Sequence, residues 1–213
     1  MRSDIRVERQ ARLERRLRRL FVIMALMVVA VILTSCGSLA AEAQSLESKG
    51  DLKGAVAVYR EALQHNPNNV EVLAPLGADL MLLGDFNEAL PIQERVVALD
   101  PKDVQTRLEL AFNYLNHQKQ PAKAVEHLTQ AVAIDPSAKN LTFLSQAQIQ
   151  VGDLAGAEKS LNKALKTDPK YGFSYVVLVG LLQKEHRTND AAQVRAQALQ
   201  QGVDSKLLPQ SAS

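Results

Sequence analysis

The chain has 213 residues, of which 46% are hydrophobic and 23% are charged, with a formal net charge of +2. This composition is typical of a folded protein with one ordinary domain and a short appendage, and it argues against wholesale disorder. Aromatic residues make up only 4%, tryptophan is absent, and residues that favour helix over strand fill most positions, so we predict an all-α protein.

Positive charge is concentrated at the N-terminus. Residues 1–19 contain eight arginines and three acidic residues, whereas the rest of the chain carries a net charge of −3. We interpret residues 1–19 as a basic cytoplasmic head. Because the bulk of the chain has no electrostatic attraction to polyanions, we predict no nucleic-acid partner. Cys36 is the single cysteine, which excludes an intrachain disulfide.

An apolar segment follows the head. Fourteen consecutive apolar residues run from Leu20 to Leu33, and no charged residue occurs before Glu42. The uncharged stretch 20–41 is long enough for a membrane-spanning helix, whereas the apolar fourteen alone fit the h-region of a signal peptide. Under both interpretations the arginines stay in the cytoplasm, so the rest of the chain faces the extracytoplasmic side. The sequence therefore predicts membrane anchoring.

The end of the apolar run resembles a lipoprotein signal. Residues 33–36 read Leu-Thr-Ser-Cys, which is similar to the bacterial lipobox. The resemblance implies cleavage before Cys36 and lipidation of that cysteine. The alternative is an uncleaved signal anchor, in which Cys36 is a small apolar residue of the membrane helix. Both interpretations remain open at this point.

The remaining sequence repeats itself with a period of about 34 residues. Leucines recur at Leu76, Leu110, Leu144 and Leu178, alanines at Ala55, Ala89, Ala124, Ala157 and Ala191, and prolines at Pro67, Pro101, Pro136 and Pro169. Gly-Asp pairs at 50–51, 84–85 and 152–153 interrupt three of the repeats near their middle. The spacing predicts two helices per repeat, joined by a turn and followed by a proline-containing connector.

These residues resemble the tetratricopeptide repeat (TPR) family. Gly84 to Ala89 and Ala98 to Asp103 are similar to the family's second helix and its exit. The resemblance implies a right-handed α-solenoid of helical hairpins, preceded by the membrane helix or signal peptide. The predicted units are 36–69, 70–103, 104–137, 138–171 and a degenerate fifth unit at 172–205, with a flexible tail at 206–213.

The expected helix ends follow from local chemistry. Asp51, Asp85 and Asp153 are predicted to cap the second helix of their units through their side chains, and Glu88 to complete a capping box with Asp85. The Asn-Pro and Asp-Pro pairs should end those helices, because the residue before proline avoids the α conformation.

No arrangement of residues indicates catalysis. The four histidines, His65, His117, His127 and His186, fall in four different units and lack neighbours at metal-ligand spacing. There is no glycine-rich phosphate loop and no nucleophile motif. We therefore predict that the chain is not an enzyme and needs no cofactor or metal.

The TPR resemblance implies a binding groove lined by the first helix of each unit, suited to a peptide or helix of a protein partner. The groove positions are Ala74, Ala78, Met81, Gln105, Leu108, Phe112, Leu115, Thr142, Gln146, Ile149, Val176 and Gly180. These residues are mostly neutral, and the charged clamp that some TPR domains use is absent. Alternatively, Leu108, Phe112 and Leu115 are simply buried between two units.

Three functions are compatible with this sequence. The leading hypothesis is a membrane-anchored scaffold that assembles an envelope complex. The second is an accessory subunit of a pilus, secretion or cytochrome-maturation machine. The third is a structural protein that assembles with copies of itself.

Overall fold

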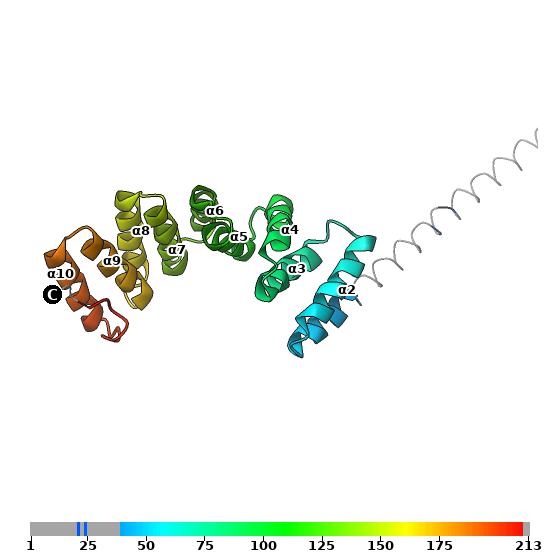
Figure 1. Cartoon of the computed structure of the whole chain (residues 1–213), viewed down its shortest axis with the longest axis horizontal. Coiled ribbons are helices and arrows are strands. Elements are labelled where there is room, and N and C mark those ends of the chain that lie inside the picture. The colour runs from blue at the N-terminus through cyan, green and yellow to red at the C-terminus, as the bar shows by residue number, and fades with distance from the viewer. Residues whose placement is uncertain (1–20, 22–23, 25–38, 211–213) are drawn as a thin grey trace, which may run out of the picture. The chain divides into compact units, whose positions relative to one another are not determined.

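The computed structural model describes residues 21, 24 and 39–210 (Figure 1). The predicted head 1–19, almost all of the apolar stretch 20–41, and Cys36 lie outside the described residues. Within the described part of the chain, no helix combines the length and apolar character needed to cross a bilayer. The chain divides into two compact units, residues 1–79 and 80–213, and each is described by itself.

Every regular element in residues 39–210 is a helix. A helix over residues 39–48 precedes the numbered helices, whose bounds are α2 Leu52–His65, α3 Val70–Leu83, α4 Phe86–Leu99, α5 Val104–Asn116, α6 Pro121–Ile134, α7 Ala138–Gln150, α8 Leu154–Thr167, α9 Gly172–Lys184 and α10 Thr188–Gln200. Successive helices are joined by short turns, and the prediction of an all-α fold of packed helical hairpins is confirmed.

In the first unit, the helix over 39–48, α2 and most of α3 share a small core. Ala43, Ala55, Tyr59 and Leu76 are at most 2% exposed. Alanine at two of these positions leaves room for neighbouring helices to approach closely. The recurring small residues of the sequence therefore mark helix contacts.

In the second unit, each helix from α4 to α10 packs against the next one, and α7 also contacts α9. One core cluster joins α4 to α7 through Val97, Leu110, Tyr114, Leu128 and Leu144. Another joins α8 to α10 and includes Val203 and Leu208, which lie beyond the last helix.

Helix ends follow the predicted chemistry with one exception. The Asp51 and Asp153 carboxylates accept hydrogen bonds of 2.9 Å from the backbone amides of Gly54 and Gly156. A Cβ on these glycines would lie 2.4 and 2.0 Å from a carboxylate oxygen. Asp85 has a similar backbone conformation but makes no side-chain cap bond. The predicted side-chain cap at Asp85 is therefore wrong, because its carboxylate accepts no hydrogen bond from the first turn of α4.

The prolines end the second helices as expected. α2, α4, α6 and α8 stop one residue before the Asn or Asp that precedes proline, and these pre-proline residues have ψ between 87° and 97°. This extended backbone is the conformation that proline imposes on its predecessor.

The structure contradicts a second prediction, which concerns the C-terminal segment. Leu208 is 3% exposed in the core of the last hairpin, and Arg195 donates to the carbonyl oxygens of Leu208 and Pro209. The Gln183 side chain donates to the Gln210 carbonyl at 2.7 Å. The predicted flexible tail from residue 206 is therefore wrong for residues 206–210, because a buried leucine and two side-chain donors hold that segment against α9 and α10.

Candidate functional site

An apolar hollow lies across the first helices of the second unit. It has a volume of about 310 Å³ and is lined by Leu108, Ala111, Phe112, Leu115, Asn116, Leu128, Phe143, Gln146, Gln150 and Phe173. We call this set the α5–α9 hollow. It brings together four of the residues predicted to form a groove, namely Leu108, Phe112, Leu115 and Gln146.

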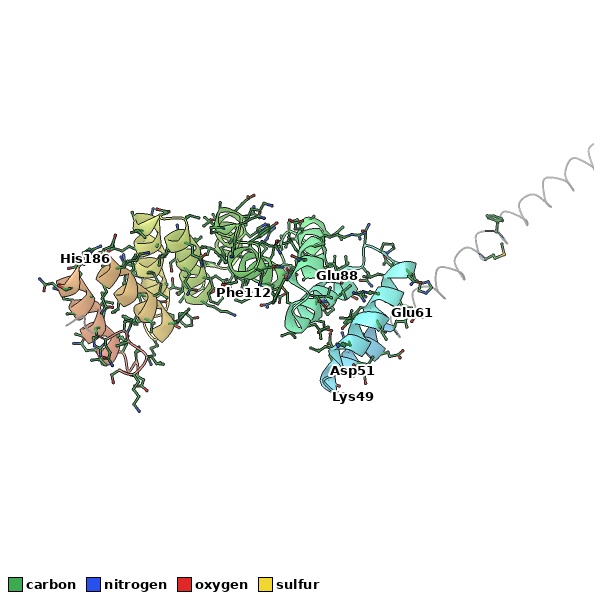
Figure 2. All side chains as sticks on the ribbon, in the orientation of Figure 1. Lys49, Asp51, Glu61, Glu88, Phe112 and His186 are labelled. Atoms are coloured by element: carbon green, nitrogen blue, oxygen red, sulfur yellow. The ribbon has the colours of Figure 1, made fainter. Side chains whose placement is uncertain are left out.

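Exposed aromatic surface distinguishes the hollow. The side chains of Phe112 and Phe173 are 53% and 39% exposed, although both are large and apolar. Phe112 is labelled in Figure 2 on α5. Leu108 and Leu115 are half-buried and pack against the core between α4 and α7. Phe112 is therefore not buried between two repeats, and that alternative is wrong for this residue. Leu108 and Leu115 are partly buried, so the alternative holds in part for them.

The three phenylalanines form an oblique row. Phe112 is the ninth residue of α5, Phe143 the sixth of α7, and Phe173 the second of α9. Each step to the next first helix thus moves three or four residues towards the helix N-terminus. The Lys139 ammonium lies 5.8 Å from the centre of the Phe143 ring, and Tyr171 contacts Phe173 edge-on at 6.5 Å.

Amide groups border the apolar surface. Asn116, Gln146 and Gln150 line the hollow, and no charged side chain of the described residues does. The Asn116 side chain donates to the Phe112 carbonyl at 3.0 Å. Carboxamides both donate and accept hydrogen bonds, as a peptide backbone requires. The hollow thus combines an apolar floor with neutral polar groups.

One predicted groove residue is not accessible. Thr142 is fully buried, and its hydroxyl donates to the Ala138 carbonyl at 2.7 Å and lies 2.7 Å from the Ser174 hydroxyl. Its assignment to the groove is wrong, because the contact between α7 and α9 covers this position.

The remaining groove positions do not line the hollow. Ile149 and Val176 are half-buried against the core of the last hairpins. Gln105 is exposed and donates to Glu109 at 2.7 Å, and Gly180 has open space around it. Ala74 and Ala78 are half-buried on α3 in the first unit, and Met81 is half-buried in the second.

The other lining residues were not among the predicted groove positions. Ala111 and Leu128 belong to the buried core and form the floor of the hollow. Asn116, Phe143 and Gln150 do not occupy the repeat positions from which the groove was predicted, whereas Phe173 occupies the same repeat position as Gln105, the second residue of its first helix. Aromatic residues near the start of α7 and α9 were the available signal, since aromatics make up only 4% of the chain.

The polar groups behind the hollow are structural. Tyr114 donates to Glu94, stacks on His127 with ring centres 5.6 Å apart, and lies under the Lys123 ammonium at 4.9 Å. Burial lowers the pKa of His127, so this ring is neutral at pH 7. Arg107 is buried and donates to the Pro101 carbonyl and to Gln130, which fixes the connector before α5.

Residues 39–210 contain no group of three or more His, Cys, Asp or Glu side chains placed to hold a metal ion. His117, one of the four histidines considered in the sequence, stacks on Phe86 and lies 5.8 Å from the Phe112 ring, centre to centre.

Two models of the same family match the chain. Tetratricopeptide repeat models cover residues 40–104 and residues 115–176, together more than half of the sequence. The chain belongs to the tetratricopeptide repeat family. The predicted resemblance is thereby confirmed, and the helical hairpins within these two ranges are TPR units.

Solved structures share the fold of this TPR protein. MamA from Desulfovibrio magneticus RS-1 is 21% identical with a TM-score of 0.72, over 78% of this chain and 94% of the other. YrrB, described as a TPR protein with an unusual peptide-binding site, is 17% identical with a TM-score of 0.68, over 78% and 85%. PilW, described as a type IV pilus biogenesis factor, is 15% identical with a TM-score of 0.64, over 78% and 77%.

A curated relative, the BBSome complex member BBS4 of Xenopus tropicalis, is 26% identical over 129 residues. The match covers 61% of this chain but only a quarter of the relative's length.

Proposed function

We propose that this TPR protein is a membrane-anchored scaffold that holds an apolar segment of a protein partner in the α5–α9 hollow. The observation that carries the proposal is the exposure of Phe112 and Phe173 on the same apolar surface. Exposed aromatic rings in a concave, water-accessible site gain free energy when a partner covers them, and aromatic residues frequently anchor protein interfaces.

The chemistry of the hollow favours a neutral peptide over a charged ligand. Its volume of about 310 Å³ is at the small end of the range for ligand pockets, and it would hold one or two bulky apolar side chains. The amides of Asn116, Gln146 and Gln150 would pair with the peptide backbone. The similarity in fold to YrrB, whose description names a peptide-binding site, supports a peptide as the ligand class.

Anchoring is the second part of the proposal. It is supported by the arginine-rich residues 1–19 and by the apolar run 20–33, which together predict that the TPR units face the extracytoplasmic side. We further propose that the protein binds no nucleic acid and performs no catalysis, since its role is to hold partners.

A test of the hollow uses the full chain and two variants. Apolar peptides selected by display on the wild-type protein are labelled, and their binding is measured by fluorescence anisotropy. Phe112→Ser with Phe173→Ser should weaken binding on the order of 30- to 1,000-fold, because each lost ring costs about 1–2 kcal/mol. Leu199→Ser is the matched control, since Leu199 is 47% exposed on α10 and does not line the hollow. If the double variant and the wild type bind the peptides with equal affinity, the hollow is not the binding site.

A more specific role in a pilus assembly machine is favoured by the similarity in fold to PilW, a pilus biogenesis factor. Copurification of pilus assembly proteins with the full chain from membranes would support that role. Their absence, together with another set of captured partners, would contradict it.

Self-assembly through the C-terminal end is the least favoured candidate. Residues 203–210 cover the last hairpin with Val203 and Leu208, so that end presents little open apolar surface. A concentration-dependent increase in mass by light scattering would restore this candidate.

A further inference from the structure

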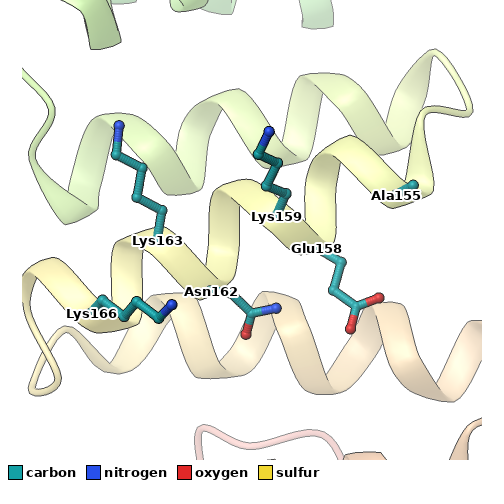
Figure 3. Close-up of a pocket in the computed structure, with 6 residues that line it drawn as sticks. All are labelled: Ala155, Glu158, Lys159, Asn162, Lys163 and Lys166. Atoms are coloured by element: carbon teal, nitrogen blue, oxygen red, sulfur yellow. The ribbon is translucent and has the colours of Figure 1, made fainter.

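A row of lysines lies on the exposed side of α8. Lys159, Lys163 and Lys166 are spaced by four and three residues, so they share one face of the helix. All three are exposed and border a shallow, open hollow together with Ala155 and Asn162 (Figure 3). We call these three residues the α8 lysine row.

The acidic residue that borders the same hollow is already paired. Glu158 accepts hydrogen bonds of 2.6 and 3.1 Å from the Arg187 guanidinium, which donates to both of its carboxylate oxygens. Figure 3 shows that Glu158 points away from the side of α8 on which Lys159 and Lys163 project. Among residues 39–210, no ion pair involves the lysine row. Its positive charge is therefore not compensated within the described part of the chain.

The charge of α8 differs from that of the other second helices. With histidine neutral, the formal charge is +1 for α2, −1 for α4 and zero for α6 and α10, whereas α8 carries +2. Arg187 pairs with Glu158 and also with Glu185 and Asp190, so it offsets the charge of Glu158 only in part, and the charge of α8 is taken as +2. The other second helices carry less positive charge. Solubility alone therefore does not explain three exposed lysines on α8.

The presence of lysine rather than arginine indicates which kind of anionic partner this surface fits. A lysine ammonium is a compact charge on a flexible stem, and it does not fix the geometry of a phosphate as the arginine fork does. The residues that line this hollow include no arginine, serine, threonine or aromatic side chain among those that the structure describes. A single specific phosphate and stacked nucleic-acid bases both fit poorly. A surface that carries many mobile negative charges fits well.

We propose that the α8 lysine row contacts the anionic lipid surface of the membrane in which the protein is anchored. This inference rests on the proposed anchoring, because a tether keeps the second unit at a high effective concentration near the lipid. Three lysines close to an anionic surface shift the docking equilibrium on the order of 100-fold, and the effect falls with salt. The lysine row and the α5–α9 hollow share no residue, so lipid contact at the row does not itself occupy the residues of the hollow.

Lysine footprinting of the full chain tests this inference. The protein is reconstituted in vesicles of phosphatidylcholine alone or mixed with phosphatidylglycerol, treated with an acetylating reagent, and analysed by mass spectrometry. We expect Lys159, Lys163 and Lys166 to react at least about threefold more slowly on the anionic vesicles than on phosphatidylcholine alone. Their reaction rates should return to the higher value at about 0.5 M salt. Lys53 and Lys102 are exposed lysines outside the row and should react equally on both.

A variant and a flotation control keep the inference falsifiable. Lys163→Gln with Lys166→Gln should abolish the slower reaction of Lys159 on anionic vesicles, while the helical circular dichroism stays unchanged. Equal reactivity of the row on both vesicle types, or the same slowing at Lys102, would overturn the inference and leave the anchoring intact. A protein that floats with neither vesicle type would overturn the anchoring, and this inference with it.

Discussion

At the scale of single residues, a buried carboxyl group in the first unit is the most unusual feature. Asp79 is 4% exposed, and its Oδ2 has no hydrogen-bond partner. Nearby, the Tyr59 hydroxyl donates to Glu47 at 2.7 Å. Burial raises the pKa of Asp79 to about 6, and the negative charge of Glu47 and a hydrogen bond with it act in the same direction. Between the usual value of 3.8 and about pH 6, the folded protein therefore holds a proton on Asp79 that the unfolded chain releases.

This shift makes stability depend on pH. Because the folded pKa of about 6 lies above the usual 3.8, the folded state binds more protons between these values, and the free energy of unfolding falls as pH rises. The stabilising contribution is complete below about pH 4 and is lost through about pH 6. Asp79→Asn should remove this loss, so that at pH 7 the variant is more stable than the wild type by about 1–2 kcal/mol.

Denaturant unfolding at about pH 4.5 and about pH 7 measures the difference. The relevant quantity is the change in stability between wild type and variant at each pH, since other groups titrate equally in both. Asp85→Asn provides the control, because Asp85 is exposed and caps α4 without a side-chain bond. If the stability difference between the wild type and the Asp79→Asn variant is the same at both pH values, the assignment is contradicted.

Residue-level prediction succeeded where a position depends on the repeat alone. The repeat places Leu108 and Phe112 on the surface of α5, and the structure places both in the hollow. It does not place Phe143, whose position on α7 matches none of the predicted groove positions, and Phe173 was missed although it occupies the same repeat position as Gln105. Nor does it show that Thr142 is covered, since that depends on how closely α7 approaches α9, and this distance is set by packing between units.

At the scale of elements, the period of 34 residues was sufficient for the helices and for the position of the turns, but not for the backbone conformation of every turn. Gly50, Gly84 and Gly152 have φ between 80° and 86°, as the Gly-Asp pairs indicate. In the other two turns of this kind, Lys119 and His186 adopt positive φ of 53° and 59°. Lysine rarely adopts this conformation and histidine adopts it more often than most residues, so packing of the flanking helices must offset the cost at Lys119 above all. The Gly-Asp pattern is absent from these two turns, and only the spacing of the repeat indicates where they lie.

The C-terminal segment gives a prediction at this scale. Leu208→Ala should lower the free energy of unfolding by about 2–3 kcal/mol, because the side chain is buried in the core of the last hairpin. Leu207→Ala is the neighbouring control and should change stability by less than about 0.5 kcal/mol, since Leu207 is 63% exposed. Urea denaturation of the full chain measures both.

Hydrogen exchange would show which helices the Leu208→Ala substitution destabilises. In a stack of repeats each unit contacts mainly its neighbours, so the loss of Leu208 should increase amide exchange first in α9 and α10. Equal stability of the two leucine variants would show that residues 206–210 behave as the flexible tail that the sequence suggested.

At the scale of the whole molecule, function depends on joining the TPR units to a membrane. The units supply a neutral hollow and a basic helix face but no means of staying near the bilayer, since three lysines give only weak, salt-dependent attraction. The apolar run would supply that means. Anchoring and lysine contacts are thus expected to act together, the first setting the location and the second the orientation.

The proposed anchor leads to a prediction about the cell fraction in which the protein is found. Deletion of residues 20–33 should move the protein from the membrane fraction to the soluble fraction, because no other segment is expected to insert into lipid. The control is Leu82→Ser, which removes a side chain that is 73% exposed outside the anchor and should leave the protein in the membrane. A deletion variant that stays in the membrane at high salt would contradict the proposed anchor.

The chemistry of the anchor follows from the intact mass of the membrane-extracted protein. A lipoprotein would lack residues 1–35 and carry acyl chains on Cys36, whereas a signal anchor would keep its full mass. Cys36→Ser separates the same two cases in cells, because it blocks cleavage of a lipoprotein precursor but leaves a membrane helix unchanged. In both cases protease added outside the cytoplasmic membrane should digest the TPR units, since the arginines of residues 1–19 retain the N-terminus in the cytoplasm during insertion. Protection of the units from that protease would reverse the proposed orientation and place their partners in the cytoplasm.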